Sequence, residues 1–225
     1  MNFSKEVWNA CVNFSIPLVY ASSAATYGLG EHGYKDDHNV IPKLTPLNPY
    51  GDSKNDFDLW VLQQKVFPPF WAGLKFFNVY GPNEITDGDY ATVIGVWRRQ
   101  IRRGEPITII GDGKQRRDFT YIDNVIQANV LSMITENEEA INTVYNVAFG
   151  ERNTLKDLVE LLKKSLTEFD SKIKDIQVIY GPNRVGDIPH SLASIDKAKK
   201  LLAYNPQFSL EKGLKEAVNW YWNNL

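Results

Sequence analysis

The sequence has 225 residues, with 25 Lys or Arg against 27 Asp or Glu, and a formal net charge of −2. This near balance excludes the basic excess by which nucleic-acid-binding proteins neutralise phosphates, and a single cysteine excludes an internal disulfide. No apolar run reaches the roughly 20 residues that a membrane span needs. We therefore expect a globular cytoplasmic protein of one large or two small domains, with no nucleic-acid or membrane partner.

The first third of the chain alternates helical and strand patterns. Residues 3–14 carry an amphipathic helical stripe, and residues 16–21 form an apolar run typical of a strand in a parallel sheet. Residues 29–49 are polar and rich in Pro and Gly, which predicts a long loop. Asn48 and Pro49 then supply the cap and first-turn proline of a helix to about residue 64. Residues 71–80 predict the next strand, which completes a βαβ pattern.

Shorter elements are predicted in the rest of the chain. The patterns indicate helices over 93–101, 123–134 with Asp123 as its N-cap, 155–166, 196–202 and 210–222. They indicate strands over 106–110, 143–149 and 176–180. The four arginines of residues 97–103 are interpreted as a solvated helix face. The second part is therefore expected to be mixed α+β.

Gly28, Gly30 and Gly33 match the glycine spacing of a dinucleotide-binding turn. Such a turn must lead directly into a helix whose N-terminus binds the pyrophosphate. The residues between Gly33 and Pro42 lack a helical period, so we interpret this segment as a loop. The three histidines also lack partners at ligand spacing, and no metal site is predicted.

Tyr50 and Lys54 lie four residues apart on a predicted helix and so share one face. About one such spacing is expected by chance in a chain of this composition, so the pair indicates a site only if its structural setting supports one. A nearby ammonium group favours the phenolate that a general base needs. Ser22 and Ser23 end a predicted strand, at the position where parallel sheets bind ligands. These four side chains form a candidate site.

Six motifs in a fixed order carry a family resemblance over nearly the whole chain. They lie at residues 22–28, 50–54, 77–82, 117–123, 145–147 and 184–187. In this order they resemble the NAD-dependent epimerase/dehydratase family of nucleotide-sugar enzymes, the extended short-chain dehydrogenases. Residues 16–84 look most like ADP-glyceromanno-heptose 6-epimerases, and residues 106–222 more like UDP-N-acetylglucosamine 4-epimerases. The second likeness has somewhat more weight, because the C-terminal part largely holds the nucleotide sugar in this family.

The resemblance implies a transient NAD-dependent oxidation of a sugar hydroxyl, of the UDP-hexose or N-acetylhexosamine 4-epimerase type, with NADP left open as cofactor and no metal. Tyr50 would take the hydroxyl proton and Ser23 would bind the reacting oxygen. The implied catalytic residues are Ser23, Tyr50 and Lys54. The implied cofactor-binding residues are Ser22, Tyr50, Lys54 and Phe77. The implied residues for a nucleotide-diphosphate sugar are Ser23, Asn78, Arg117, Arg184 and Asp187.

Family members carry a glycine-rich βαβ unit before the first of these motifs. We therefore expect an α/β fragment with a partial Rossmann-like parallel sheet that lacks its first βαβ unit, followed by a small mixed α+β substrate-binding domain. Residues 1–83 would be the C-terminal part of the NAD-binding Rossmann domain with the Ser/Tyr/Lys site. Residues 84–225 would mainly bind the nucleotide sugar, with some segments returning to the sheet.

Two further expectations concern partners and activity. The resemblance implies a homodimer through a helix pair that includes the Tyr50 helix, or a second chain that supplies the missing βαβ unit. An alternative function is that of a catalytically inactive remnant or interaction module that only binds a nucleotide sugar.

Overall fold

The structure is a computed structural model that describes residues 2–85, 88, 91–182, 188 and 190–224. Its α-helices are α1 Asn2–Asn13, α2 Pro49–Leu62, α3 Val93–Arg102, α4 Ile122–Ile134, α5 Leu155–Thr167, α6 Asp196–Leu202 and α7 Leu210–Asn223. Its strands are β1 Leu18–Ser23, β2 Trp71–Phe76, β3 Val79–Tyr80, β4 Ile107–Ile110, β5 Arg116–Arg117, β6 Thr120–Tyr121, β7 Thr143–Val147, β8 Asn153–Thr154 and β9 Val178–Gly181. Short 3₁₀ helices are η1 Ala24–Tyr27, η2 Ile41–Lys43, η3 Glu138–Ala140 and η4 Ser171–Asp175.

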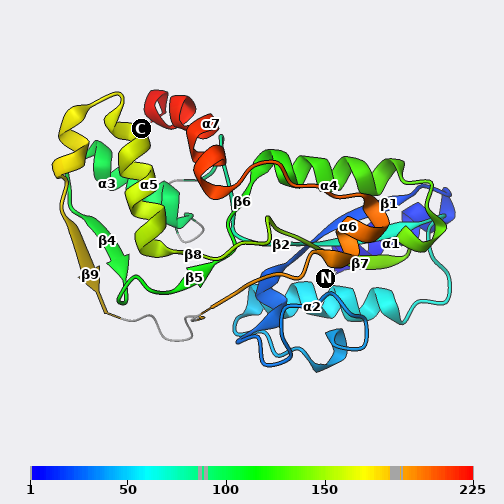
Figure 1. The fold of residues 1–225 in the computed structure, drawn as a ribbon. Helices are drawn as coiled ribbons and strands as arrows, with labels where there is room; N and C mark the ends of the chain where they lie inside the picture. The colour runs from blue at the N-terminus through cyan, green and yellow to red at the C-terminus, as the bar shows by residue number, and fades with distance from the viewer. Residues whose placement is uncertain (1, 86–87, 89–90, 183–187, 189, 225) are drawn as a thin grey trace.

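A three-stranded parallel sheet in the order β1-β2-β7 forms the centre of the larger lobe (Figure 1). Helix α2 covers one face of this sheet and α4 covers the other (Figure 1). Strand β2 lies in the middle and is buried from Trp71 to Lys75, as expected for a strand with a helical layer on each side. The predicted Rossmann-like α/β fold is confirmed.

The strand predicted over residues 71–80 is two strands in the structure. Strand β2 ends at Phe76, and Asn78 takes a positive φ of 35°. This left-handed conformation is tolerated by asparagine and turns the chain out of the sheet. Strand β3 then begins at Val79 and pairs with β6 instead. The break places Asn78 beyond the carboxyl end of β2.

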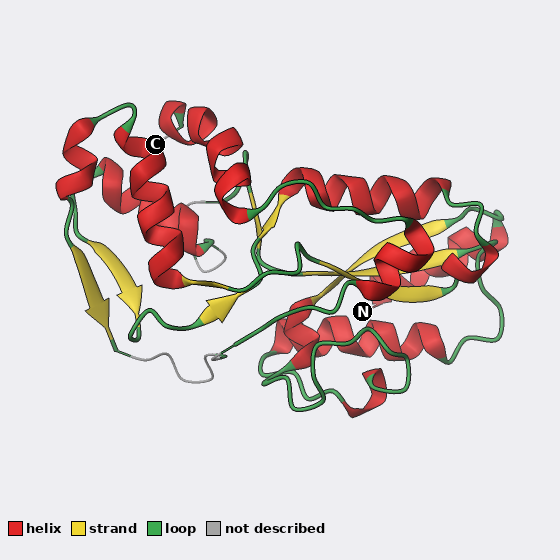
Figure 2. Ribbon diagram, in the orientation of Figure 1, coloured by secondary structure: helices red, strands yellow, loops and turns green. Residues whose placement is uncertain are grey.

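The buried apolar residues form two cores. One surrounds the β1-β2-β7 sheet and includes Trp8, Leu74 and Val144, together with residues of α4 and of the segment 193–204. The other lies among α3, α5, α7 and β4, with Trp97 and Leu162 near its centre. Figure 2 shows the corresponding two lobes, joined by several extended segments. Segments well beyond residue 84 thus pack on the central sheet.

The outer edge of β1 is open. Within the part of the chain that the structure describes, no strand pairs with this edge. Leu18, Val19 and Tyr20 are half-buried and Ala21 is exposed. Helix α4, which covers one face of this sheet and contacts β1, exposes apolar side chains on its outer face, namely Ile126, Val130, Met133 and Ile134. An open parallel edge beside an apolar helix face is the surface on which another strand and helix would pack.

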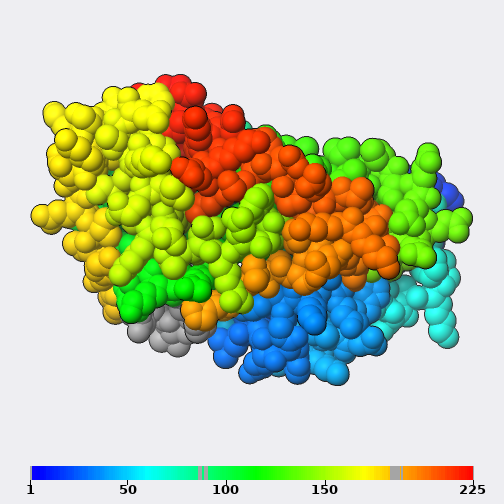
Figure 3. Space-filling model, in the orientation of Figure 1, coloured from blue at the N-terminus to red at the C-terminus, as the bar shows by residue number. Residues whose placement is uncertain are grey.

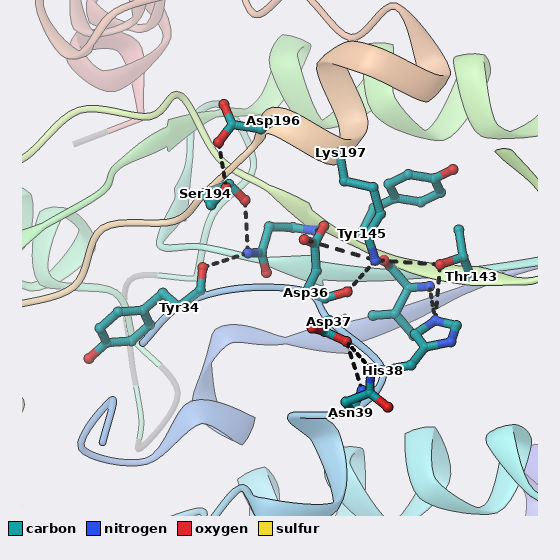
Figure 4. A network of polar contacts seen from close by, with 12 residues as sticks. Tyr34, Asp36, Asp37, His38, Asn39, Thr143, Tyr145, Ser194, Asp196 and Lys197 are labelled. Atoms are coloured by element: carbon teal, nitrogen blue, oxygen red, sulfur yellow. Dashed lines mark hydrogen bonds and ion pairs between the residues drawn. The ribbon is translucent and has the colours of Figure 1, made fainter. Parts of the chain in front are cut away.

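The outer edge of β7, in contrast, is covered by side chains (Figure 4). The backbone N–H of Val144 donates to Nε2 of His38 at 3.2 Å, and that of Asn146 donates to Oδ2 of Asp36 at 2.9 Å. The ammonium group of Lys197 donates to the carbonyl oxygen of Val144 at 2.9 Å. The polar loop after η1 and helix α6 therefore satisfy the backbone groups of this edge without adding a strand.

Two local predictions are wrong. Asp123 does not cap α4, because Tyr121 occupies the N-cap position and Asp123 lies in the first turn. The arginines of residues 97–103 do not all lie on a solvated face, because Arg98 is wholly buried. Its guanidinium carbon lies 4.8 Å and 4.4 Å from the ring centroids of Trp220 and Tyr221, an arrangement that cation–π attraction favours. It thereby links α3 to α7, which also packs against α5 (Figure 3).

Candidate functional site

Ser23 is the last residue of β1 and also the N-cap of η1. Its Oγ accepts a hydrogen bond from the backbone N–H of Ala25 at 3.1 Å. A serine hydroxyl that accepts in this way still has its own hydrogen to donate. Ser23 therefore presents a hydroxyl donor at the carboxyl end of a parallel strand, where such sheets bind ligands.

Tyr50 lies in the first turn of α2, and its side chain is 51% exposed. The helix starts here because Asn48 accepts a hydrogen bond from the N–H of Gly51 at 2.8 Å, with Pro49 in the first turn. Lys54 lies one turn further on, with its Nζ 5.8 Å from the centroid of the Tyr50 ring. The same Nζ donates to the carbonyl oxygen of Ala21 at 2.9 Å. The lysine thus connects the helix to β1 beside an exposed phenol.

A close contact between α2 and η1 brings these groups together. A Cβ atom at Gly51 would lie 2.8 Å from the carbonyl oxygen of Ala25 and 2.9 Å from Cβ of Pro46. Only glycine allows the helix to approach this closely. Because Gly51 follows Tyr50 and Ala25 follows the Ser23 cap by two residues, this contact sets both side chains at the same end of β1.

Sequence reasoning missed a buried polar group behind this site. Asp58 follows Lys54 by four residues on α2, and its carboxylate forms a wholly buried ion pair with Lys75 at 2.6 Å. Ser22 donates to the same carboxylate at 2.7 Å. The four-residue spacing from Tyr50 through Lys54 to Asp58 was a readable signal. Lys75 gave a second one, as a charged residue within an apolar strand.

A second region of the site is a cavity of about 410 Å³ beside β3 and α3. Asn78 and Arg117 contribute amide and guanidinium groups to its lining, and Trp97, Phe119 and Leu155 contribute apolar walls. A guanidinium group matches the geometry of phosphate oxygens. The cavity can therefore hold a molecule with an anionic part and a flat apolar part.

Asp118 supports this cavity and was also missed from the sequence. Its carboxylate is wholly buried and accepts hydrogen bonds from the N–H groups of Phe149 and Gly150, each at 3.2 Å. Burial raises the pKa of Asp118 to about 7, although these backbone donors lower it. The backbone oxygen of Asp118 accepts from the side-chain amide of Asn78 at 2.9 Å. The Asp118 carboxylate thus anchors the chain next to Arg117, and the Asp118 backbone oxygen orients the side chain of Asn78.

The structure brings most of the predicted site residues to two places. Ser22, Ser23, Tyr50 and Lys54 gather at the end of β1, and Asn78 and Arg117 line the cavity. Phe77 is wholly buried, with its ring against Tyr27 and Tyr34 at centroid distances of 5.9 Å and 6.2 Å, and its backbone N–H donates to the carbonyl oxygen of Val147 at 3.1 Å. The predicted residues Arg184 and Asp187 lie outside the described residues.

Two kinds of feature are absent from the described residues. None of the helices found there is long and apolar enough to cross a membrane. Likewise, that part of the chain holds no group of three or more His, Cys, Asp or Glu side chains arranged to bind a metal ion.

Comparison with protein families gives one match over most of the chain. Residues 1–148 match the family described as "NAD dependent epimerase/dehydratase family". A curated relative is the ADP-L-glycero-D-manno-heptose-6-epimerase of Fusobacterium nucleatum, which is 33% identical over 97% of this chain and 69% of its own length.

Two solved structures are similar in fold and sequence. The UDP-N-acetylglucosamine 4-epimerase of Methanobrevibacter ruminantium, in complex with UDP-N-acetylmuramic acid, has a TM-score of 0.82 and 31% identity over 100% of this chain and 69% of its own. The UDP-glucuronic acid 4-epimerase of Bacillus cereus, in complex with UDP-glucuronic acid and NAD, has a TM-score of 0.76 and 27% identity, covering 93% of this chain and 62% of its own. The chain spans 69% of the length of the Fusobacterium nucleatum relative and 52% of that of a second ADP-L-glycero-D-manno-heptose-6-epimerase, from Nitratidesulfovibrio vulgaris.

Proposed function

The chain belongs to the NAD dependent epimerase/dehydratase family, and we propose that it forms the sugar-binding and proton-transfer part of a nucleotide-sugar epimerase. The observation that carries this proposal is the gathering of Ser23, Tyr50 and Lys54 at the carboxyl end of β1. A hydroxyl donor, a phenol and an ammonium group at one place are the groups needed to remove a proton from a sugar hydroxyl.

In the proposed reaction, Ser23 donates a hydrogen bond to the reacting sugar oxygen while Tyr50 takes its proton. Lys54 lies beside this phenol, with its Nζ 5.8 Å from the centroid of the Tyr50 ring. After the keto sugar has rotated within the site so that its other face is presented, Tyr50 returns the proton to the same oxygen. NAD, when bound, supplies the hydride acceptor and donor that this chemistry requires.

The described residues fit one end of NAD. Lys54 and the exposed phenol of Tyr50 offer polar groups suited to the nicotinamide ribose, next to the strand end where ligands bind. Among the described residues, the glycine-containing segment after Gly28 forms no helix N-terminus for the pyrophosphate, because it runs through turns to the short η2 at Ile41. The bound NAD of the Bacillus cereus relative supports the choice of cofactor.

We further propose that a glycine-rich βαβ unit joins the open edge of β1 and completes the cofactor site. The supporting observations are the unpaired edge of β1 and the apolar outer face of α4 beside it, within the described residues. A parallel strand added at this edge would bring a crossover helix onto a sheet face. Mixing the chain with a separately expressed unit of this kind should restore NAD binding, measured by nicotinamide fluorescence after reduction.

The proposed substrate is a UDP-hexose or UDP-N-acetylhexosamine, with Arg117 and Asn78 holding the diphosphate. The likeness to the UDP-N-acetylglucosamine 4-epimerase structure over the whole chain supports this choice. The likeness to an ADP-heptose 6-epimerase at 33% identity favours ADP-L-glycero-D-manno-heptose as the second candidate.

Calorimetric titration of UDP and ADP distinguishes the two candidates. We expect UDP to bind more tightly, and Arg117→Ala to weaken its binding at least tenfold, because a bidentate phosphate contact is lost. Arg103→Ala, which removes an exposed arginine at the end of α3, is the matched control and should leave the affinity unchanged. Tighter binding of ADP would favour the heptose substrate, and binding of neither nucleotide would contradict the proposed function.

Turnover tests the catalytic assignment. With NAD and the complementing unit, Tyr50→Phe should reduce the epimerisation rate by about 10²–10⁴-fold, the range typical of a lost general base. Full activity in this variant would contradict the assignment. A chain that binds UDP tightly but shows no turnover in any such mixture would instead be the inactive nucleotide-sugar-binding remnant.

We also propose that the chain forms a homodimer through α1 and α2. Supporting this, Phe3 and Phe14 of the α1 region are 77% and 75% exposed, more than any other large apolar side chain that the structure describes. Light scattering should then report twice the chain mass of 25.7 kDa. A scattering mass equal to that of one chain at micromolar concentration would contradict the dimer.

A further inference from the structure

The buried ion pair behind the serine site lies at the junction of three elements. Asp58 belongs to α2, Lys75 to β2, and both side chains are wholly excluded from solvent. The carboxylate accepts hydrogen bonds from Lys75 at 2.6 Å, from Ser22 at 2.7 Å and from the hydroxyl of Tyr20 at 3.0 Å. Ser22 and Tyr20 are residues of β1, so Asp58 joins the Tyr50 helix to the strand that ends at Ser23.

Lys75 reaches the other side of Ser23 through a threonine. Its Nζ donates to Oγ1 of Thr26 at 2.7 Å. The hydroxyl of Thr26 in turn donates to the backbone oxygen of Ser23 at 2.8 Å. The ion pair therefore holds the residue before Ser23 through Asp58, and the carbonyl group of Ser23 through Lys75 and Thr26.

Side chains of α2 form hydrogen bonds with two consecutive residues of β1. Tyr50, Lys54 and Asp58 follow one another at four-residue spacing and so lie along one face of α2. Lys54 bonds to the carbonyl oxygen of Ala21, and Asp58 bonds to the hydroxyl of the next residue, Ser22. These two contacts together fix both the height and the rotation of α2 relative to the end of β1.

Fold stability alone gives a poor reason for this ion pair. Lys75 lies in the central strand, and burial lowers the pKa of its ammonium group, while Asp58 opposes the shift. Removing two charges from water costs energy that their attraction offsets only with good geometry, and apolar pairs of similar volume often serve a core equally well. The location of the pair, with bonds to both sides of Ser23, offers a better reason.

We propose that Asp58 and Lys75 are positioning residues that fix the hydroxyl of Ser23 relative to Tyr50 and Lys54. This inference rests on the proposed function for its catalytic meaning, because it assigns the pair to the geometry of that proton transfer. The positioning itself is a property of the chain without ligand and can be measured separately.

One double variant and one conservative single variant test this proposal. Asp58→Leu with Lys75→Met replaces the ion pair by apolar side chains of the same branching and about the same length, and it also removes the acceptor of the Ser22 and Tyr20 hydroxyls. Thr26→Val is nearly isosteric and cuts only the connection from Lys75 to the carbonyl group of Ser23. Thr167→Val is the matched control, because its hydroxyl also donates to a backbone oxygen, that of Lys163 at 2.7 Å, but on α5 in the other lobe.

Amide hydrogen exchange of the chain without ligand is the first readout. The N–H of Ala25 reports on Ser23, because it donates to the Ser23 hydroxyl oxygen. We expect its exchange to become at least tenfold faster in the double variant and in Thr26→Val, while exchange of the central β2 amide of Leu74 changes less than threefold. Thr167→Val should change neither. If the ion pair contributed only to the stability of the fold, its loss would instead speed exchange of the Ala25 and Leu74 amides together.

Kinetics give the second readout, in the complemented holoenzyme. A positioning role predicts that Thr26→Val reduces kcat about tenfold or more with KM within twofold of the original value, because the nucleotide contacts are unchanged. Unchanged Ala25 exchange in Thr26→Val would overturn the positioning role even if the double variant failed to fold. Altered Ala25 exchange without any wild-type turnover would leave the positioning in place and count against the proposed function instead.

Discussion

The backbone N–H of Val144 donates a hydrogen bond to Nε2 of His38 at 3.2 Å, between residues 106 positions apart. The hydroxyl oxygen of Thr143 lies 2.9 Å from the same nitrogen, and Lys197 is bonded to the adjoining carbonyl group of Val144. A ring nitrogen that accepts a backbone N–H carries no proton of its own. Protonation of His38 therefore removes one of the hydrogen bonds that join the loop before α2 to β7.

We expect the chain to lose stability on mild acidification because of His38. Burial and the positive charge of Lys197 lower the pKa of His38, while Asp37 and Asp58 raise it. With a folded pKa below the unfolded value of about 6.5, the unfolded state binds the proton more readily. The stabilising contribution is present above pH 6.5 and is lost as the pH falls through the folded pKa. Urea midpoints between pH 7.5 and 5 measure this slope.

The control for this prediction is His38→Gln, whose side-chain oxygen can accept the same N–H but does not titrate. Asp36 and Asp118 have pKa values raised by burial and contribute a slope of opposite sign, which both proteins share. The difference between wild type and variant therefore isolates His38. A difference that stays constant from pH 7.5 to 5 would contradict the role of His38.

Asp118→Asn should make the stability of the fold less dependent on pH between pH 5 and 8. Burial raises the pKa of Asp118 to about 7, so its ionisation costs stability as the pH rises from the unfolded value of about 3.9 to the folded one. The asparagine amide does not titrate, although its nitrogen would face the N–H donor of Phe149 or Gly150 and leave one buried donor without an acceptor. Denaturant unfolding at pH 5 and 8 measures the change, with the exposed Asp175→Asn as the matched control. An equal change with pH in both variants and in wild type would contradict this prediction.

Gly51→Ala should destabilise the fold although alanine favours helices over glycine by about 1 kcal/mol. The added methyl group would lie 2.8 Å from the carbonyl oxygen of Ala25, so α2 must shift away from η1. We expect a net loss of about 1–3 kcal/mol. Ser53→Ala, at an exposed position of the same helix, is the control. A Gly51→Ala variant more stable than wild type would mean that this contact yields easily.

Arg98→Lys should loosen the attachment of α7. The lysine ammonium lacks the planar guanidinium that stacks near Trp220 and Tyr221 and donates to the backbone oxygen of Asn224 at 2.9 Å. We expect a loss of about 1–3 kcal/mol and faster amide exchange in α7. Arg102→Lys, at an exposed position, should have no effect. Protection of α7 equal to that of wild type would contradict the linking role of Arg98.

The sequence was sufficient for the features that repeat locally. The apolar run of β1, the Asn48-Pro49 start of α2 and the four-residue spacing of Tyr50 and Lys54 are short-range patterns, and the structure places Ser23 near them as a parallel sheet requires. Asn78 also carried a local signal, since asparagine tolerates a positive φ. The strand predicted over residues 71–80 nevertheless included Asn78.

Pairings between distant residues could not be predicted in the same way. Asp58 was readable from its spacing, but the acceptor role of His38 toward Val144 depends on how a loop folds back across 106 positions. The two-residue strands β5, β6 and β8 are too short to produce a periodic pattern. Arg98 looked solvated because its aromatic partners, Trp220 and Tyr221, lie more than a hundred residues away in the sequence.

The unequal edges of the central sheet limit how copies of this chain can associate. His38, Asp36 and Lys197 occupy the backbone groups along the outer side of β7, so a further strand can bond only beside β1. Two copies that met through their sheets would therefore have to meet β1 to β1. Such a contact uses the same surface on both copies and therefore closes as a dimer. An open fibril would need two different, complementary surfaces on each copy. The side chains that cover β7 thus leave the β1 edge as the one at which the central sheet of the described residues can pair with a second copy.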